Sequence, residues 1–198
     1  GASIEDTRTE VSVTSRYYYD RGSAGFNYCR SDEDDYESDA VAVDASYDSD
    51  DGMSTYSASL SASADEIEPT QGVTPTGTLK DEKDIRSAWV GVSRIVSKRA
   101  ILRFGLSYTY RDGFLTDPYK LNDERPDRRN EWVIQGGYRQ FLVTPNAALH
   151  VDYRYFNDDW GIDAHTVDIA WHQNVGGRTA IIPFLRYHTQ DEADFFAN

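Results

Sequence analysis

The stretch "ALHVDYRYFNDDW", residues 148–160, decides the fold because two kinds of side chain alternate along it. Every second side chain from Leu149 to Tyr155 is aliphatic or aromatic, and the side chains between them, from His150 to Arg154, are ionisable. A β-strand sends successive side chains to opposite faces of its sheet. The stretch therefore predicts a strand with one apolar face and one ionic face.

The same alternation recurs along most of the chain, whereas helical periodicity is nearly absent. The stretch "YSASLSASA", residues 56–64, is the clearest example, with serine at every second position. We count about ten such segments, each near the roughly 9–11 residues with which a tilted strand crosses a bilayer. The segment Ser87–Ser97 carries apolar side chains at both parities, so its faces stay unassigned and a β-bulge remains an open alternative.

Composition restricts the class of protein. The chain has 198 residues and a net charge of −14, and its mean hydropathy is −0.66. It contains no run of about 20 apolar residues, which excludes a transmembrane helix. The acidic balance excludes nucleic acid as a partner, because binding phosphates needs clustered Lys and Arg. Cys29 is the single cysteine, so we expect no internal disulfide and no cysteine metal site.

The connections between these segments alternate in length. Short turns fall at 21–24, 50–53, 97–99, 144–146 and 174–178, and longer polar connections fall at 31–39, 65–84, 112–130 and 157–164. Short turns at one end and long loops at the other are typical of outer-membrane barrels, whereas a soluble sandwich needs Greek-key crossovers. The predicted fold is all-β: one domain, residues 1–198, formed as an antiparallel up-and-down meander. This meander is a transmembrane β-barrel of about ten strands, or a large part of a bigger barrel.

Aromatic side chains of the apolar parity gather near the ends of the predicted strands. Bilayer interfaces select such belts of Tyr and Trp. The predicted girdle near the short turns is Tyr17, Tyr19, Phe26, Tyr47, Tyr56 and Trp171, and the girdle near the long loops is Tyr108, Tyr110, Trp132, Tyr153, Tyr155 and Tyr187.

The opposite parity carries charges of both signs. We interpret these residues as a ladder of ion pairs across neighbouring strands inside the barrel, in which Arg and Asp neutralise each other. A lumenal hydrolase that uses His150 and Asp152 as an acid–base pair is the alternative, although no nucleophile motif accompanies this pair. The predicted ladder is Arg103, Arg139, His150, Asp152, Arg154, Asp168, His172 and Arg186.

Acidic residues cluster between residues 32 and 51 without any Lys or Arg. Calcium binds six to eight oxygens, which clustered carboxylates can supply. The turn with Asp48, Asp50 and Asp51 is a weak calcium candidate, because it lacks the spacing and the late Glu of a calcium loop. The alternative is a solvated acidic loop next to an ordinary Asp-Asp-Gly hairpin turn, and divalent cations at the acidic loops stay a candidate partner.

Several longer motifs resemble a bacterial family of predicted outer-membrane β-barrels that is known only as a domain of unknown function. The resemblance is strong from Asp84 to Phe196, and it implies an outer-membrane location in Gram-negative bacteria but no established activity. Members of the family are longer than this chain, so we expect either a portion of a longer barrel or a shortened member. The motifs are "GFLTDPYK" (113–120), "ERPD" (124–127), "ALHVDYRYFNDDWGIDAHTVDIAW" (148–171) and "IPFLRYHTQDEADFF" (182–196).

The sequence thus predicts a non-enzymatic protein that acts as a narrow or plugged porin-like pore, a transporter component or a scaffold. A barrel of about ten strands leaves little open channel, because eight strands are already filled by side chains. We expect outer-membrane lipid as a partner, a protein partner or self-assembly if the barrel does not close, and no cofactor. A water-soluble or self-assembling β-sheet protein is the main alternative.

Overall fold

The computed structural model describes residues 7–68, 81–117 and 124–195, and it contains strands and no helix in these ranges. No described helix is therefore long and apolar enough to cross a membrane. The strands are β1 (Thr9–Tyr19), β2 (Gly22–Asp32), β3 (Tyr36–Asp48), β4 (Ser54–Ile67), β5 (Asp81–Ser97), β6 (Ala100–Gly113), β7 (Arg128–Leu142), β8 (Ala147–Asp158), β9 (Asp163–Val175), β10 (Thr179–Ile181) and β11 (Phe184–Gln190).

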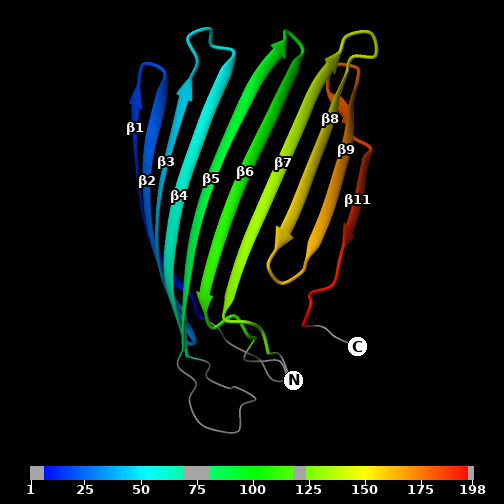
Figure 1. Cartoon of the computed structure of the whole chain (residues 1–198). Coiled ribbons are helices and arrows are strands. Elements are labelled where there is room, and N and C mark those ends of the chain that lie inside the picture. Colours follow the sequence, from blue (N-terminus) through cyan, green and yellow to red (C-terminus); the bar gives the residue numbers. More distant parts are fainter. Residues whose placement is uncertain (1–6, 69–80, 118–123, 196–198) are drawn as a thin grey trace.

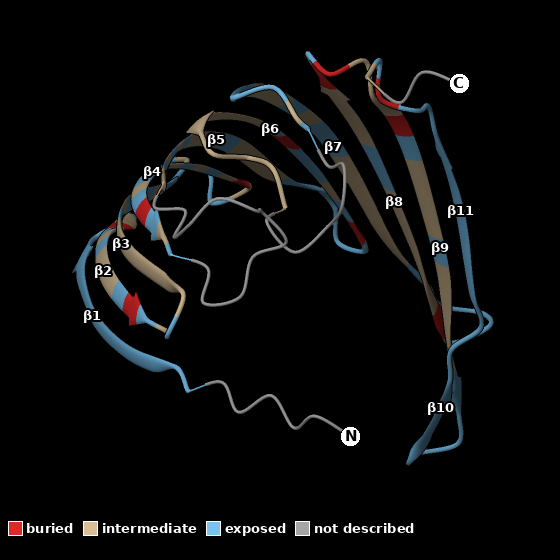
Figure 2. Ribbon diagram, turned by 90° about the horizontal axis from the view of Figure 1, so that it is seen from below, coloured by how far each residue is buried: buried red, intermediate tan, exposed pale blue. Residues whose placement is uncertain are grey.

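All eleven strands form one antiparallel sheet in which β1 to β9 follow each other in chain order. Strands β10 and β11 both pair with β9, and Ile182 and Pro183 separate them. Proline lacks the N–H that a central strand donates, so this break belongs at an edge of the sheet. The predicted antiparallel meander is confirmed, and Figures 1 and 2 show it as a single curved wall.

The curved wall is open in the part of the chain that the structure describes. Strand β1 pairs with β2 alone, and β11 pairs with β9 alone. Figure 2 shows β1 at one edge of the curve and β10 and β11 at the other. Of the two alternatives within the predicted fold, these strands match a large part of a barrel rather than a ring closed between β1 and β11.

The strands are longer than the sequence predicted, and two of the predicted long loops are tight turns. Strands β3 to β9 have 12 to 17 residues, because acidic segments expected to be loops continue the ladder. Residues 33–35 and 159–162 connect their strands through short turns, closed by hydrogen bonds from Glu33 N to Tyr36 O (2.9 Å) and from Asp158 N to Ile162 O (3.1 Å). The connections over 68–80 and 114–127 are longer, and residues 69–80 and 118–123 lie outside the described ranges.

The two faces of the wall have opposite chemistry. Directly opposed residues of an antiparallel pair share a face, so the strand register assigns every side chain. The convex face carries the apolar parity, and its aliphatic side chains are exposed, for example Leu60 at 60% and Val90 at 53%. The concave face carries the Ser and ionic parity. No large side chain is fully buried among the described residues, so a hydrophobic core within this single layer does not stabilise the sheet.

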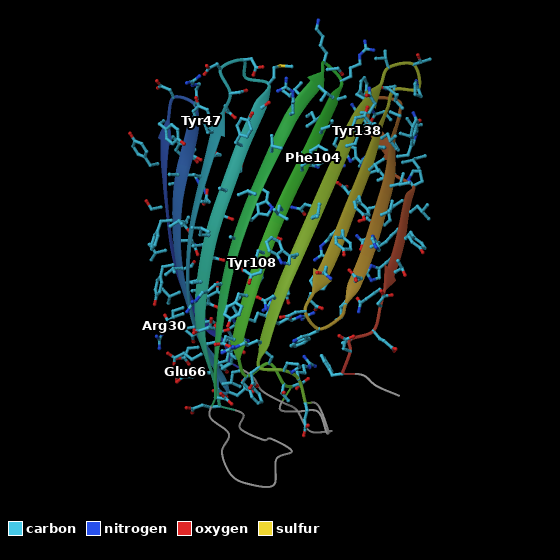
Figure 3. All side chains as sticks on the ribbon, viewed as in Figure 1. Arg30, Tyr47, Glu66, Phe104, Tyr108 and Tyr138 are labelled. Atoms are coloured by element: carbon cyan, nitrogen blue, oxygen red, sulfur yellow. The ribbon has the colours of Figure 1, made fainter. Side chains whose placement is uncertain are left out.

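The predicted aromatic girdles lie on the convex face. Figure 3 shows Tyr47 and Tyr138 toward the end with the short turns and Tyr108 farther down the wall. Tyr47 lies opposite Tyr56 on β4, and Tyr108 stacks against Trp132 with ring centroids 4.7 Å apart. Phe26 is a correction: it lies in the middle of β2, because β2 begins at Gly22 and runs on to Asp32 through the acidic segment that was expected to be a loop.

The structure also assigns the faces of β5. Ala88, Val90 and Val92 lie on the convex face, opposite Tyr108, Leu106 and Phe104 of β6. Trp89 shares the concave face with Ser59 and Ser107. The pairing of β5 with β6 shifts register between Ile95 and Ser97, which explains why the apolar residues at this end of the strand fit neither parity.

Candidate functional site

A band of charged side chains crosses the concave face in one row of the strand register. Asp152 on β8 lies directly opposite Asp168 on β9, which in turn lies opposite Arg186 on β11. We name these residues and their charged neighbours the lumenal band. The lumenal band consists of Arg103, Arg139, Asp152, Arg154, Asp168 and Arg186.

The lumenal band borders a hollow of about 640 Å³ on the concave side. Residues from β4 to β9 and from β11 line this hollow. Glycines at inward positions form part of its floor, and Trp89 covers two of them: a Cβ added to Gly91 would lie 2.5 Å from the Trp89 ring, and one added to Gly105 would lie 3.0 Å from its Nε1. The large ring of Trp89 can therefore lie flat along the wall instead of projecting across the hollow.

Two arginines neutralise the opposed carboxylates. Arg139 Nη2 donates to both oxygens of Asp152, at 2.8 and 2.7 Å. Arg186 holds Asp168 from the other side through two parallel bonds, from Nε at 2.6 Å and from Nη2 at 2.8 Å. Like charges directly opposite each other destabilise a sheet. These arginines offset that repulsion and fix both carboxylates to the wall.

Two further arginines of the lumenal band have no ion pair in the part of the chain that the structure describes. Arg103 reaches the space above Gly137, where its Nε is 3.5 Å from a Cβ added to that glycine. Arg154 lies over the Phe156 ring, 5.4 Å from the centroid. Arginine outnumbers aspartate in the lumenal band, so the band is locally cationic although the whole chain is strongly acidic.

The two histidines of the predicted ladder contact each other and not a carboxylate. The ring centroids of His150 and His172 are 4.0 Å apart. The Asp152 carboxylate is occupied by Arg139, and no hydrogen bond joins His150 to Asp152 among the described residues. The acid–base pair that a hydrolase would need is therefore not assembled in this arrangement.

A second polar network lies at the end of the sheet where residues 33–35 and 159–162 form their turns, and sequence reasoning missed it. Asp65 is 3% exposed. It accepts hydrogen bonds from Tyr36 Oη at 2.5 Å and from Ser38 Oγ at 2.7 Å, and the Lys83 ammonium lies 3.3 Å away. These residues come from the adjacent ends of β3, β4 and β5. The network ties these strand ends together on the concave side.

The network continues around the rim through Arg129. Its guanidinium contacts Asp158 at 2.6 Å and Glu131 at 3.2 Å, and it stacks over the Trp160 ring at 4.4 Å. Arg111 on β6 also reaches Glu131, at 3.1 Å. The signal in the sequence was the inward parity of these charged residues near the strand ends. It was hidden because the segments were interpreted as loops.

The structure does not bring the three residues of the calcium candidate together. No group of three metal-ligating side chains occurs among the described residues. Asp48 accepts from Thr55, Asp50 pairs with Arg21, and Asp51 accepts from Ser49 Oγ at 2.5 Å and from Met53 N at 2.9 Å. These two hydrogen bonds lower the pKa of Asp51 below its usual range. The three carboxylates close a hairpin turn and do not converge on one point.

Comparisons with known proteins extend this description. A family model with the description "Protein of unknown function (DUF3570)" matches residues 1–198, and no curated protein sequence matches the chain. CdiB from Acinetobacter baumannii has a similar structure, with a TM-score of 0.51 and 14% identity over 94% of this chain. The chain spans 38% of that CdiB chain. The β domain of the Bordetella autotransporter BrkA aligns over 94% of this chain and 84% of its own, with 13% identity and a TM-score of 0.42. At these identities the likeness to CdiB concerns the fold alone.

Proposed function

The chain belongs to the DUF3570 family, and we propose that it forms the wall of an outer-membrane β-barrel in a Gram-negative bacterium. In this proposal residues 1–198 act as one domain, the convex face contacts lipid, and the concave face lines a narrow or plugged aqueous passage. The role is transport or scaffolding without catalysis.

One observation supports this proposal above all: the polarity of the sheet is inverted relative to a water-soluble protein. The large apolar side chains are exposed on the convex face, while the charges and serines lie on the concave face. In water, an uncovered apolar face of this extent would drive association. In a bilayer, the same face is solvated by acyl chains, and it also carries Tyr and Trp side chains of the kind that bilayer interfaces select.

The lumenal band gives the passage a preferred charge. Arg103 and Arg154 have no carboxylate partner among the described residues, so their fields act on any solute in the hollow. Removing water from an anion costs free energy, and fixed cations offset this cost where they take the place of the lost water. We therefore expect the passage to favour anions over cations, against the overall acidity of the chain.

The experiment is refolding of the full chain with lipid vesicles. Boiled and unboiled samples on an SDS gel report insertion, because a folded barrel migrates faster unless it is boiled. The reversal potential across a bilayer in a potassium chloride gradient then reports selectivity. We expect anion preference in the native chain and a loss of this preference in the R103Q/R154Q double variant. Arg94→Gln on the convex face is the matched control and should leave the reversal potential unchanged.

A self-assembling β-sheet protein is the second candidate, and the open edges of β1 and β11 favour it. Unpaired edges pair readily with other chains. This candidate predicts a folded, β-rich assembly in plain buffer without detergent. Such a soluble assembly would contradict the membrane proposal.

A further inference from the structure

The hollow on the concave face has one aromatic surface in a lining that is otherwise polar. In the part of the lining that the structure describes, Trp89 is the single aromatic side chain of the inward parity. The other inward side chains are hydroxyl, amide or charged groups, among them Ser57, Ser93 and Gln135. At about 640 Å³ the hollow is within the size range of small-molecule sites. The lining therefore combines one apolar surface with many hydrogen-bonding groups.

Trp89 forms that apolar surface by leaning along the wall. Its ring extends over Gly91 and Gly105, which lie opposite each other in the next row of the register. A Cβ on Gly91 would lie 2.5 Å from the ring, so a larger residue there would push the indole away from the backbone. One side of the ring lies against glycine, and the ring lines the hollow. Its other side is therefore available for a ligand to stack on.

Hydrogen-bonding groups without partners surround this ring. Gln135 lies opposite Gly105, and its amide nitrogen and Trp89 Nε1 approach the same point above that glycine, at 2.7 and 3.0 Å from an added Cβ. Ser57 lies opposite Gly91 on the neighbouring strand. The side chains of Trp89, Gln135 and Ser57 make no hydrogen bond to any described residue. These groups are available to a ligand.

Positive charge is concentrated beside the same ring. Arg154 lies opposite Gln135, and Arg103 lies opposite Gly137 in the adjacent row, so the two arginines flank β7. Neither has an ion pair among the described residues, in contrast to the other two arginines of the lumenal band. A guanidinium binds a carboxylate or a phosphate through two parallel hydrogen bonds. Both arginines are therefore suited to an anionic group of a ligand.

We propose that the hollow binds an anionic pyranose sugar, with the C–H face of the ring on Trp89 and a carboxylate or phosphate at Arg103 and Arg154. The proposal rests on the anion-preferring passage proposed above and names its ligand class. A pyranose has an apolar C–H face and a rim of hydroxyl groups, which match the indole and the polar side chains around it. An inorganic anion would leave Trp89 without a contact, and a flat aromatic acid would leave Ser57 and Gln135 without partners. A neutral sugar would leave both arginines unpaired.

The charge is tested by the binding of glucuronate and glucose to the full chain, refolded in detergent micelles, as measured by saturation-transfer difference NMR. These two sugars share a ring and differ in one carboxylate. We expect glucuronate to bind about tenfold more tightly than glucose, a difference that hydrogen bonds to a charged group can supply. In R103Q/R154Q this difference should disappear. Arg94→Gln on the convex face should preserve it.

The stacking surface is tested separately. Trp89→Leu should weaken the binding of both sugars about fivefold and leave their ratio unchanged, because it removes a ring contact and no charge. Trp132→Leu on the convex face is the matched control and should change neither. Acetate has the charge without a ring, and benzoate has a flat ring without hydroxyl groups. Both should displace glucuronate only at about tenfold higher concentration than glucuronate itself.

The unboiled band on the SDS gel and the reversal potential separate this inference from the proposed function. If the chain inserts and prefers anions, equal binding of glucuronate and glucose would overturn the inference and leave the proposed function intact. Displacement of glucuronate by an equal concentration of acetate or benzoate would overturn it as well. A chain that does not insert, or that inserts without anion preference, would instead contradict the proposed function, and with it the passage on which this inference rests.

Discussion

Asp152 and Asp168 lie directly opposite each other on neighbouring strands, and Arg139 and Arg186 neutralise them from either side. Removing one arginine leaves a carboxylate without its partner next to a like charge. We expect R139Q to lower the free energy of unfolding by about 1 kcal/mol, the upper end for partly exposed pairs. Denaturant titration of the protein in detergent would measure it. The double variant R139Q/D152N should recover most of the loss, and a double variant no better than R139Q would contradict the pairing.

Cys29 offers a native probe of the concave face. It lies on that face, opposite Ser12 and Ala40, and its thiol is free and half-buried. Maleimide reagents carrying a charge reach thiols in water but not thiols in hydrocarbon. In vesicles we therefore expect Cys29 to react with a charged maleimide, as followed by mass spectrometry. The matched control is a C29S/V41C variant, whose thiol moves to the convex face and should be protected. The reverse pattern would show that the faces are assigned the wrong way round.

At the scale of the strand, the faces could be predicted from sequence and the strand ends could not. Parity repeats every two residues, so an alternating stretch such as 56–64 specifies its two faces without any knowledge of neighbours. The acidic segment 31–39 looked like a loop because its charges repel. In the structure Arg30 pairs with Glu37 and Asp39, and the Tyr28 hydroxyl also donates to Asp39. These cross-strand partners depend on the register, which the local sequence does not specify.

The same limit applies to the rim network. Asp65 and Lys83 belong to opposed ends of β4 and β5, and residues 69–80 between these strands gave no sequence signal for how the ends align. The lumenal band was easier to predict because its members are ionisable residues in the middle of alternating strands. Pairing between Arg and Asp was part of the prediction, but which residues pair was not predictable: the structure places Arg139 beside Asp152, and not His150 as the hydrolase alternative required.

The middle of β5 tests whether the convex face contacts lipid. Val90 lies opposite Ala58 and Leu106, among exposed aliphatic side chains. We expect Val90→Arg to destabilise the folded state in vesicles by about 2–4 kcal/mol, the cost of a midplane arginine on the lipid face of a barrel. Ser61→Arg on the concave face of β4 is the matched control and should cost much less, because that face contacts water. Equal costs, measured as the folded fraction against denaturant in vesicles, would contradict a lipid-facing convex surface.

At the scale of the whole molecule, the two edges of the sheet set the remaining question. Each unpaired backbone N–H or C=O in hydrocarbon costs several kcal/mol, so a wall with open edges cannot persist in a bilayer. Strands β1 and β11 must therefore acquire partners there, from each other, from a second copy or from further strands. In lipid nanodiscs we expect the amides of β1 to exchange with deuterium as slowly as those of β5. In mild detergent we expect the amides of β1 to exchange faster than those of β5. Hydrogen–deuterium exchange with mass spectrometry measures both.

Cross-linking identifies the partner. With Cys29 replaced by Ser, cysteines at Val13 on β1 and Leu185 on β11 lie on the two edge strands and share the convex face. A cross-link within one chain would mean that β1 and β11 close the ring, and a cross-link between chains would mean that copies complete each other's wall. Protected edges without either cross-link would require strands from elsewhere. If β1 exchanged rapidly in nanodiscs while β5 stayed protected, the edge of the sheet would be unpaired in lipid. This result would contradict a transmembrane wall, because backbone groups in hydrocarbon need hydrogen-bond partners.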